Sequence, residues 1–236
     1  GFIVKRGLID SSVLNQINDC VWEAAKELRL PFYRNNPDSY TLPKNHGLFP
    51  QTEPKSTYHN GLGIPNYFNG SSNGWTWRHY TPCTENWFLK HTAQHPNVQK
   101  VAHQLIGNRI RPSNRCRGLY VVFPEVTNKD TGLSLSPHTD GTASQLNCMI
   151  YAADCPPGGG GFTIWPGSHK SCYYHMNTEY NMEPKQGYNE LLGKIRETIS
   201  PIEISASAGD CCFWHPRAMH SAGANTSSQL RIVIPC

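Results

Sequence analysis

Beyond Gly107, short apolar runs alternate with turns, and this pattern limits the fold of the chain more than any other feature. Each run is rich in β-branched and aromatic residues, and the residues between the runs include many of the chain's 20 glycines and 18 prolines. Runs of this kind predict the strands of a sandwich, barrel or jelly roll. The expected strands are 118–123, 145–152, 162–165, 199–205, 210–215 and 229–234.

The first 107 residues predict one short strand followed by helices. The strand is expected over 1–8, and the helices are expected over 11–28, 85–93 and 96–106. In the first helix apolar residues recur at every third or fourth position, which indicates one buried face. Residues 31–82 are irregular and rich in aromatic side chains, so we expect a lid over a substrate pocket there.

This order of elements predicts an α+β fold that is mainly β, with N-terminal helices supporting a β core. The chain has 236 residues and no segment that looks like a linker. We therefore expect a single domain over 1–236, with the helical support and lid in about 1–107 and the β core in about 108–236.

Composition excludes several classes of protein. The net charge is +4 without a basic run, which predicts no nucleic-acid partner but is compatible with an anionic small-molecule substrate. The apolar stretches are too short for a membrane span. Nine cysteines without a C-x-x-C pair predict mostly buried thiols in the cytoplasm or another reducing compartment, although one or two disulfides stay open. We expect a monomer or dimer, and the start at Gly1 indicates a processed or trimmed chain.

The pair His138 and Asp140 is the first candidate metal site. Side chains two residues apart on a strand share a face, so both can reach one ion. A second histidine from another strand would complete the two-histidine, one-carboxylate set of non-haem Fe(II) oxygenases. With 11 histidines and 17 acidic residues in the chain, this pair alone could equally be a polar strand end.

Two later features strengthen that interpretation. Residues 209–225 form a turn, an apolar strand and a loop that carries His220. Arg231 lies in the apolar run 230–234, where burial of a guanidinium is costly unless it has an anionic partner. Its planar fork suits a carboxylate bound by two hydrogen bonds, although an ion pair within the protein would also explain Arg231 by itself.

Taken together, these residues resemble the phytanoyl-CoA dioxygenase family. The resemblance rests on His138-x-Asp140, on the run FTIWPGSHK at 162–170, on His220-Ser-Ala-Gly-Ala-Asn225 and on Arg231. The second histidine lies 82 residues after the first, and the arginine follows 11 residues later. The opening residues also look like the usual start of the family. The resemblance therefore spans nearly the whole chain and implies a double-stranded β-helix (jelly roll).

The resemblance also implies roles for individual residues. His138, Asp140 and His220 would bind Fe(II), Arg231 would bind the distal carboxylate of 2-oxoglutarate, and no catalytic residue is expected beyond the metal ligands. Further cosubstrate contacts are expected from Asn147, Arg117 and Ser221, and substrate contacts from Tyr151, Trp75 and Trp77. Some family members carry a serine two residues after the distal histidine, where this chain has Ala222 beside Ser221.

The implied activity is oxidation of a small organic substrate. Fe(II), 2-oxoglutarate and O2 would hydroxylate, or otherwise oxidise, a C–H bond with release of succinate and CO2. Family members that halogenate lack the metal-binding acid, so Asp140 favours hydroxylation. The resemblance implies 11 residues between the distal histidine and the arginine. His220 has this spacing to Arg231, whereas His215 lies 16 residues before it, so His220 is expected as the distal ligand. Two alternatives remain: a non-catalytic β-helix module that binds a ligand, and a cupin-like metalloenzyme that does not use 2-oxoglutarate.

Overall fold

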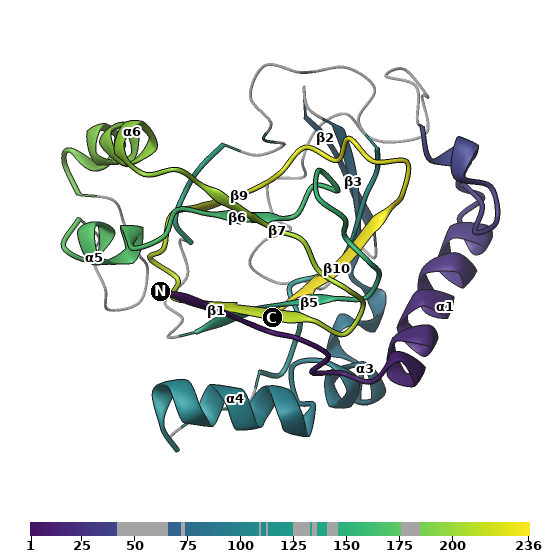
Figure 1. Cartoon of the computed structure of the whole chain (residues 1–236). Coiled ribbons are helices and arrows are strands. Elements are labelled where there is room, and N and C mark those ends of the chain that lie inside the picture. The colour runs from purple at the N-terminus through teal and green to yellow at the C-terminus, as the bar shows by residue number, and fades with distance from the viewer. Residues whose placement is uncertain are drawn as a thin grey trace.

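Two facing antiparallel sheets form the centre of the molecule (Figure 1). The computed structural model describes residues 1–41, 66–71, 74–108, 110–111, 113–124, 133, 136–140, 146–175 and 185–236, without the side chains of 66–71, 74 and 75. Within these residues the major sheet has seven strands in the order β1-β8-β5-β10-β4-β3-β2, and the minor sheet has three in the order β7-β6-β9. This arrangement is the predicted jelly roll.

Seven of the ten strands in the described residues agree closely with the expected runs, and β2, β3 and β9 are additional. The major sheet contains β1 (Phe2–Lys5), β2 (Asn66–Ser71), β3 (Gly74–His79), β4 (Leu119–Val122), β5 (Asn147–Tyr151), β8 (Cys211–Trp214) and β10 (Arg231–Pro235). The minor sheet contains β6 (Phe162–Ile164), β7 (Ile202–Ile204) and β9 (His220–Ala222).

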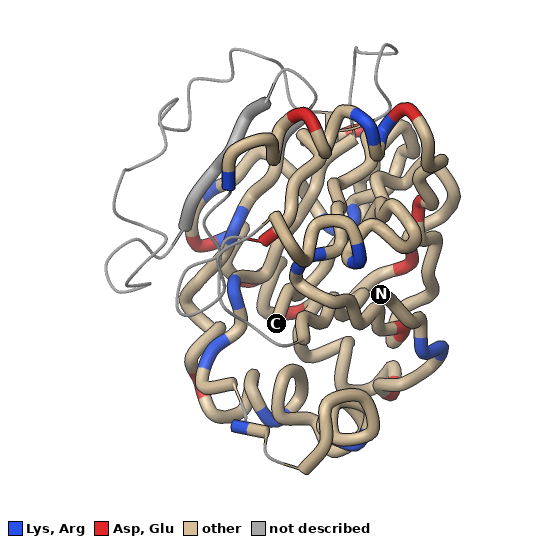
Figure 2. Tube along the Cα trace, turned by 90° about the vertical axis from the view of Figure 1, so that its left-hand side faces the viewer, with Lys and Arg blue, Asp and Glu red and all other residues tan. Residues whose placement is uncertain are grey.

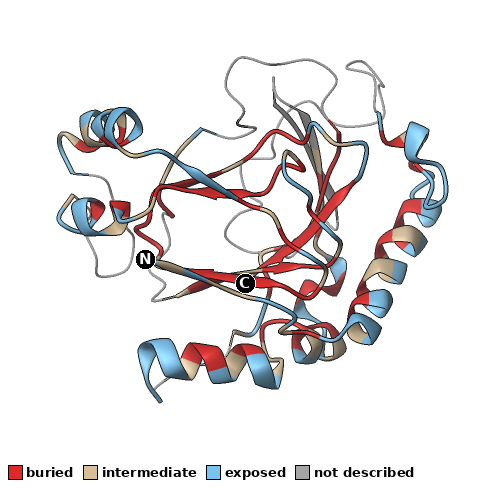
Figure 3. Ribbon diagram, viewed as in Figure 1, coloured by how far each residue is buried: buried red, intermediate tan, exposed pale blue. Residues whose placement is uncertain are grey.

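The helices lie around the sheets and bury one side each (Figures 1 and 3). They are α1 (Ser11–Glu27), α3 (Asn86–His91), α4 (Pro96–Ile106), α5 (Ser168–Tyr173) and α6 (Tyr188–Thr198). The side chain of Asp10 caps α1 by accepting a hydrogen bond from the backbone N–H of Ser12. Proline is the first residue of α4, and Gly107 follows its last turn with a φ of 86°. The three predicted helices are confirmed.

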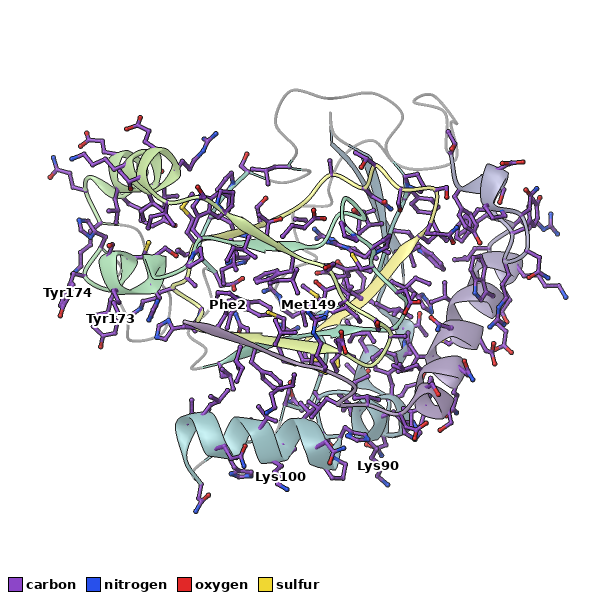
Figure 4. All side chains as sticks on the ribbon, in the orientation of Figure 1. Phe2, Lys90, Lys100, Met149, Tyr173 and Tyr174 are labelled. Atoms are coloured by element: carbon purple, nitrogen blue, oxygen red, sulfur yellow. The ribbon has the colours of Figure 1, made fainter. Side chains whose placement is uncertain are left out.

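The core is divided by the major sheet. One cluster lies on its outer face, against α1, α3 and α4, and includes Ile17, Phe88 and Ile150. A second cluster lies between the two sheets, and Figure 4 shows Phe2 and Met149 in this space. A smaller third cluster joins α5 and α6 to the end of the minor sheet. The space between the sheets is where the inward-facing polar residues of the next section lie.

The segment 31–82 differs from the sequence-based expectation. Strands β2 and β3 form a hairpin there that extends the major sheet, because β3 also pairs with β4. Residues 42–65 and 72–73 lie outside the description, so the predicted lid largely does too. Strands β1 to β3 all come from the first 107 residues, so position 107 does not separate helices from sheet. The short α5, α6 and β9 were also not expected.

Charged residues are distributed along many segments, with basic and acidic positions interspersed (Figure 2). Among the helices that the structure describes, none has the length and apolar character needed to cross a bilayer.

Candidate metal centre

Two distant segments meet at the end of the minor sheet. His138 and His220 form an isolated antiparallel bridge in which each backbone N–H donates to the carbonyl oxygen of the other, at 2.9 and 2.8 Å. His220 begins β9, which pairs with β6. The backbone N–H of Asp140 donates to the carbonyl oxygen of Pro216 at 3.1 Å, which fixes the third residue to the same loop. Backbone hydrogen bonds therefore bring all three side chains together.

The side chains of His138, Asp140 and His220 form a candidate metal site. Their ligand atoms all lie within 4.8 Å of one another, and Nε2 of His220 lies 3.5 Å from Oδ2 of Asp140. Asp140 and His220 are buried, whereas His138 is partly exposed. The structure thus brings the three predicted residues together in one cluster. His215 is not part of it, and its ring lies beside that of His169 instead.

The hydrogen bonds of the two histidines fix which nitrogen faces the site. Nδ1 of His138 lies 2.8 Å from the carbonyl oxygen of Ser136, and Nδ1 of His220 lies 2.9 Å from that of Ala218. A carbonyl oxygen only accepts, so both Nδ1 atoms carry the proton. This leaves the lone pair of each Nε2 available to a metal, as in metal sites whose histidines are oriented by backbone carbonyls.

Three donors hold the carboxylate of Asp140. Nη1 of Arg117 donates to Oδ1 at 2.9 Å, while Nδ2 of Asn147 and Nε1 of Trp214 donate to Oδ2 at 2.7 and 3.2 Å. Arg117 and Asn147, which the sequence predicts as cosubstrate contacts, both donate hydrogen bonds to Asp140, and their contact with a cosubstrate stays a prediction. Trp214 was missed, although it lies on the inward face of β8 directly opposite Asn147.

These contacts also set the protonation states. Burial would raise the pKa of Asp140, but His220 and the Arg117 guanidinium outweigh burial and hold that pKa below its ordinary value. Burial lowers the pKa of His220 to about 4, against the opposing influence of Asp140. At neutral pH His220 is therefore neutral and Asp140 is ionised. Two histidines and one carboxylate are the donor set that suits non-haem Fe(II).

Arg231 is a buried cation without an anionic partner among the residues that the structure describes. Its side chain is 5% exposed, it forms no salt bridge with any residue that the structure describes, and its Nε has no hydrogen-bond partner there. Nη1 donates to the carbonyl oxygen of Gly160, whose left-handed φ of 77° favours glycine. Glu203 is instead bound by the backbone N–H groups of Gly158 and Gly161. A carboxylate-bearing cosubstrate fits this site.

The family model for phytanoyl-CoA dioxygenase matches residues 76–233, well over half of the chain. The chain belongs to the phytanoyl-CoA dioxygenase family. Together with the triad, membership makes it an iron- and 2-oxoglutarate-dependent enzyme, as the sequence predicted. No curated protein sequence matches the chain.

Solved structures share the fold of this family member along its whole length. The 2-oxoglutarate-dependent epimerase SnoN of nogalamycin biosynthesis is 21% identical, with 76% of its chain covered and a TM-score of 0.55. The carbocyclase SnoK of the same pathway is 15% identical, with 78% covered and a TM-score of 0.60. AviO1 from Streptomyces viridochromogenes is 14% identical, with 88% covered and a TM-score of 0.58. At these identities the likeness concerns the fold.

The remaining predicted site residues lie elsewhere. Trp77 is fully buried in the outer core, where its ring contacts Phe32, so it offers no surface to a substrate. Tyr151 is also fully buried, and its hydroxyl donates to the carbonyl oxygen of Ile204. Alternation along β9 directs Ser221 to the opposite face from His220. The side chain of Trp75 lies outside the description.

Proposed function

We propose that the protein hydroxylates a C–H bond of a small organic substrate. In the balanced reaction, substrate R–H, O2 and 2-oxoglutarate give R–OH, succinate and CO2. The supporting observation is that the candidate metal triad and Arg231, an arginine without an anionic partner among the described residues, both lie on the inner side of the two sheets. A chain of contacts links them: the Phe162 ring lies 5.2 Å from that of His220, and its backbone N–H donates to the hydroxyl of Tyr151. Tyr151 and Arg231 lie close enough to influence each other's pKa.

Each residue has a distinct part in this proposal. His138 and His220 would bind iron through Nε2, and Asp140 would supply the single negative charge. When bound, iron and 2-oxoglutarate supply the activation of O2, which no side chain can provide. Arg231 would bind the distal carboxylate of 2-oxoglutarate and so fix the orientation of the cosubstrate relative to the triad.

Aromatic rings from both sheets border the site. Trp214 and Phe162 lie against His220, at ring distances of 5.6 and 5.2 Å, and also contact each other at 4.5 Å. Both are buried. They exclude water from one side of the metal site, which strengthens the electrostatic interactions there and limits side reactions.

The competing functions make different demands on these residues. A non-catalytic binding module would not require three oriented metal ligands, and a cupin-like metalloenzyme would not require a buried guanidinium. Retention of both features favours a 2-oxoglutarate-dependent oxidation. Two of the fold neighbours are described as an epimerase and a carbocyclase, so the outcome of the reaction has to be established from the product.

An anaerobic titration tests the cosubstrate assignment. Fe(II) followed by 2-oxoglutarate should give a weak visible charge-transfer band. In Arg231→Ala the midpoint for 2-oxoglutarate should rise roughly tenfold or more, because loss of one charged hydrogen-bonded pair costs about 1.5–3 kcal/mol. His215→Ala is the matched control and should keep the wild-type midpoint. Absence of the band, or equal midpoints in wild type and Arg231→Ala, would refute the assignment.

Product analysis tests hydroxylation itself. Candidate metabolites are screened for substrate-dependent release of succinate, and products from positive reactions are examined after turnover under 18O2. A product that gains one labelled oxygen atom supports hydroxylation. Succinate release with an unlabelled, epimerised or cyclised product would replace hydroxylation by another oxidation at the same site.

A further inference from the structure

A cavity of about 650 Å³ lies between helix α4 and the outer side of the major sheet. Helix α4 forms one wall, and the start of β5, β8 and residues from 110–111 and 113–117 form the others. This volume is within the usual range for small-ligand pockets. None of the three metal ligands lines it.

One half of the cavity is apolar. Helix α4 contributes Val98, Ala102 and Ile106, which follow one another at helical spacing along the same stripe. Phe213 of β8 and Leu146 lie across from them. Together they form a surface that would bury the hydrocarbon part of a ligand.

The other half is cationic. Arg111, Arg115 and Arg117 all line the cavity, and neither Asp nor Glu is among the lining residues that the structure describes. Arg111 and Arg115 are exposed and form no ion pair within the described part of the chain. The charge of Arg117 is paired with Asp140, whereas the guanidinium groups of Arg111 and Arg115 have no acid beside them among the described residues and create a positive potential that attracts anions. Their forks suit carboxylate and phosphate groups.

We propose that this cavity is a second ligand site, for a small amphipathic anion. The ligand class is a carboxylate or phosphate monoester with an apolar body, which lies against α4 and Phe213 while its anionic group binds Arg111 and Arg115. The proposal does not depend on the hydroxylation proposed above, because the cavity and the metal triad share no lining residue.

The position of Arg117 makes this ligand an effector rather than the oxidised substrate. Arg117 and Asn147 both line the cavity and both donate hydrogen bonds to Asp140. The cavity thus lies behind the metal-binding carboxylate and is separated from it by these two side chains. A ligand that engages Arg117 also acts on Asp140, and by linkage metal binding would act on ligand affinity in return.

Calorimetry on the metal-free protein tests the site with defined probes. Octanoate and octyl phosphate represent the two anionic groups, and 1-octanol provides the same body without charge. We expect saturable binding of at least one anion and at least about tenfold weaker binding of 1-octanol, equivalent to about 1.4 kcal/mol. If neither anion binds at millimolar concentration, the site does not exist as proposed. The anion that binds more tightly identifies the headgroup.

Charge variants test the location. Arg111→Gln/Arg115→Gln should weaken anion binding about tenfold or more and leave 1-octanol unchanged. The control Lys90→Gln/Lys100→Gln removes the same charge from side chains that point away from the sheet (Figure 4). Arg117 is kept, because its contact with Asp140 would confuse the result. If both double variants weaken binding equally, or if neither does, the assignment to this cavity is wrong. Circular dichroism verifies that each variant is folded.

Discussion

The inner and outer faces of the major sheet are made by the same strands but have different chemistry. Along β5, β8 and β10 the inward positions include Asn147, Trp214 and Arg231, whereas the outward positions between them are apolar and pack against the helices. The adjacent Cys211 and Cys212 belong to the outer and inner clusters respectively. Because side chains alternate along a strand, position parity separates residues that hold the site from residues that hold the fold.

The difference also has an energetic side. The outer face gains stability from apolar burial, apart from the cavity beside α4. The inner face buries a carboxylate and a guanidinium, and burial of charge is unfavourable unless partners compensate. Asp140 has such partners in Arg117, Asn147 and Trp214, while Arg231 has no anionic partner among the described residues. The inner face is therefore organised for ligands at some expense of stability.

Of the variants considered, His220→Ala on the inner face should have the largest effect: it should lose Fe(II) affinity and keep the fold. Removal of one of three ligands should lower Fe(II) affinity by more than the roughly 10–100-fold that loss of a supporting residue costs. The fold should survive, because the backbone bridge to His138 does not need the imidazole. Anaerobic Fe(II) titration and circular dichroism measure the two effects. Iron binding retained by His220→Ala but lost by His215→Ala would reassign the distal ligand.

A substitution on the outer face should have the reverse effect: it should lower the stability of the fold and leave Fe(II) affinity unchanged. Ile150→Ala removes a fully buried side chain of β5 and should reduce the free energy of unfolding by about 2–5 kcal/mol. Chemical denaturation of the metal-free protein measures this loss. The Fe(II) affinity of the folded variant should equal that of the wild type. A drop in affinity comparable to that of His220→Ala would mean that the two faces are not separable.

A smaller loss of Fe(II) affinity is expected when a residue that supports Asp140 on the inner face is removed. Asn147→Ala removes a hydrogen bond to Asp140 and should weaken Fe(II) binding roughly tenfold, as is typical for residues that orient a ligand. Met149→Leu on the same inward face is the matched control: neither side chain can donate a hydrogen bond to the acid, so the affinity should stay unchanged. Equal affinities in the two variants would show that Arg117 and Trp214 suffice to hold Asp140.

The smallest effect is expected for His215→Ala. His215 is partly buried, and its backbone N–H rather than its ring donates to the carbonyl oxygen of Gly1. We expect a stability change of about 1 kcal/mol or less and unchanged iron binding. Thermal unfolding in the absence and presence of metal measures both. A metal-dependent difference between His215→Ala and wild type would place this histidine in the site after all.

The sequence was sufficient for the parts of the molecule whose pattern is local. The stripe of α1, the proline and glycine that bound α4, and the alternation around Cys211 and Arg231 are all visible in the chain. The apolar positions of α6, Tyr188, Leu192 and Ile195, had the same kind of spacing and were overlooked.

The contacts of the site were harder to predict because they depend on tertiary structure. Arg117, Asn147 and Trp214 come from three separate strands or their ends, and only the pairings of β4 with β10, β10 with β5 and β5 with β8 bring them to Asp140. Trp77 was expected to contact the substrate, but the structure places it in the core. It lies in an irregular-looking segment that suggested a lid, but pairing of β3 with β4 buries it in the core.

The backbone bridge between His138 and His220 has a consequence for engineering. Two main-chain hydrogen bonds, and a third from Asp140 to Pro216, place these positions independently of the side chains they carry. The backbone therefore fixes the three positions, and the donor groups that they carry can be exchanged. Replacing the carboxylate with a smaller residue, or one imidazole with another donor, would alter which metal and which small anions the site binds without changing the fold. A library confined to these three positions could therefore be searched for new reactivity while foldedness is held nearly constant.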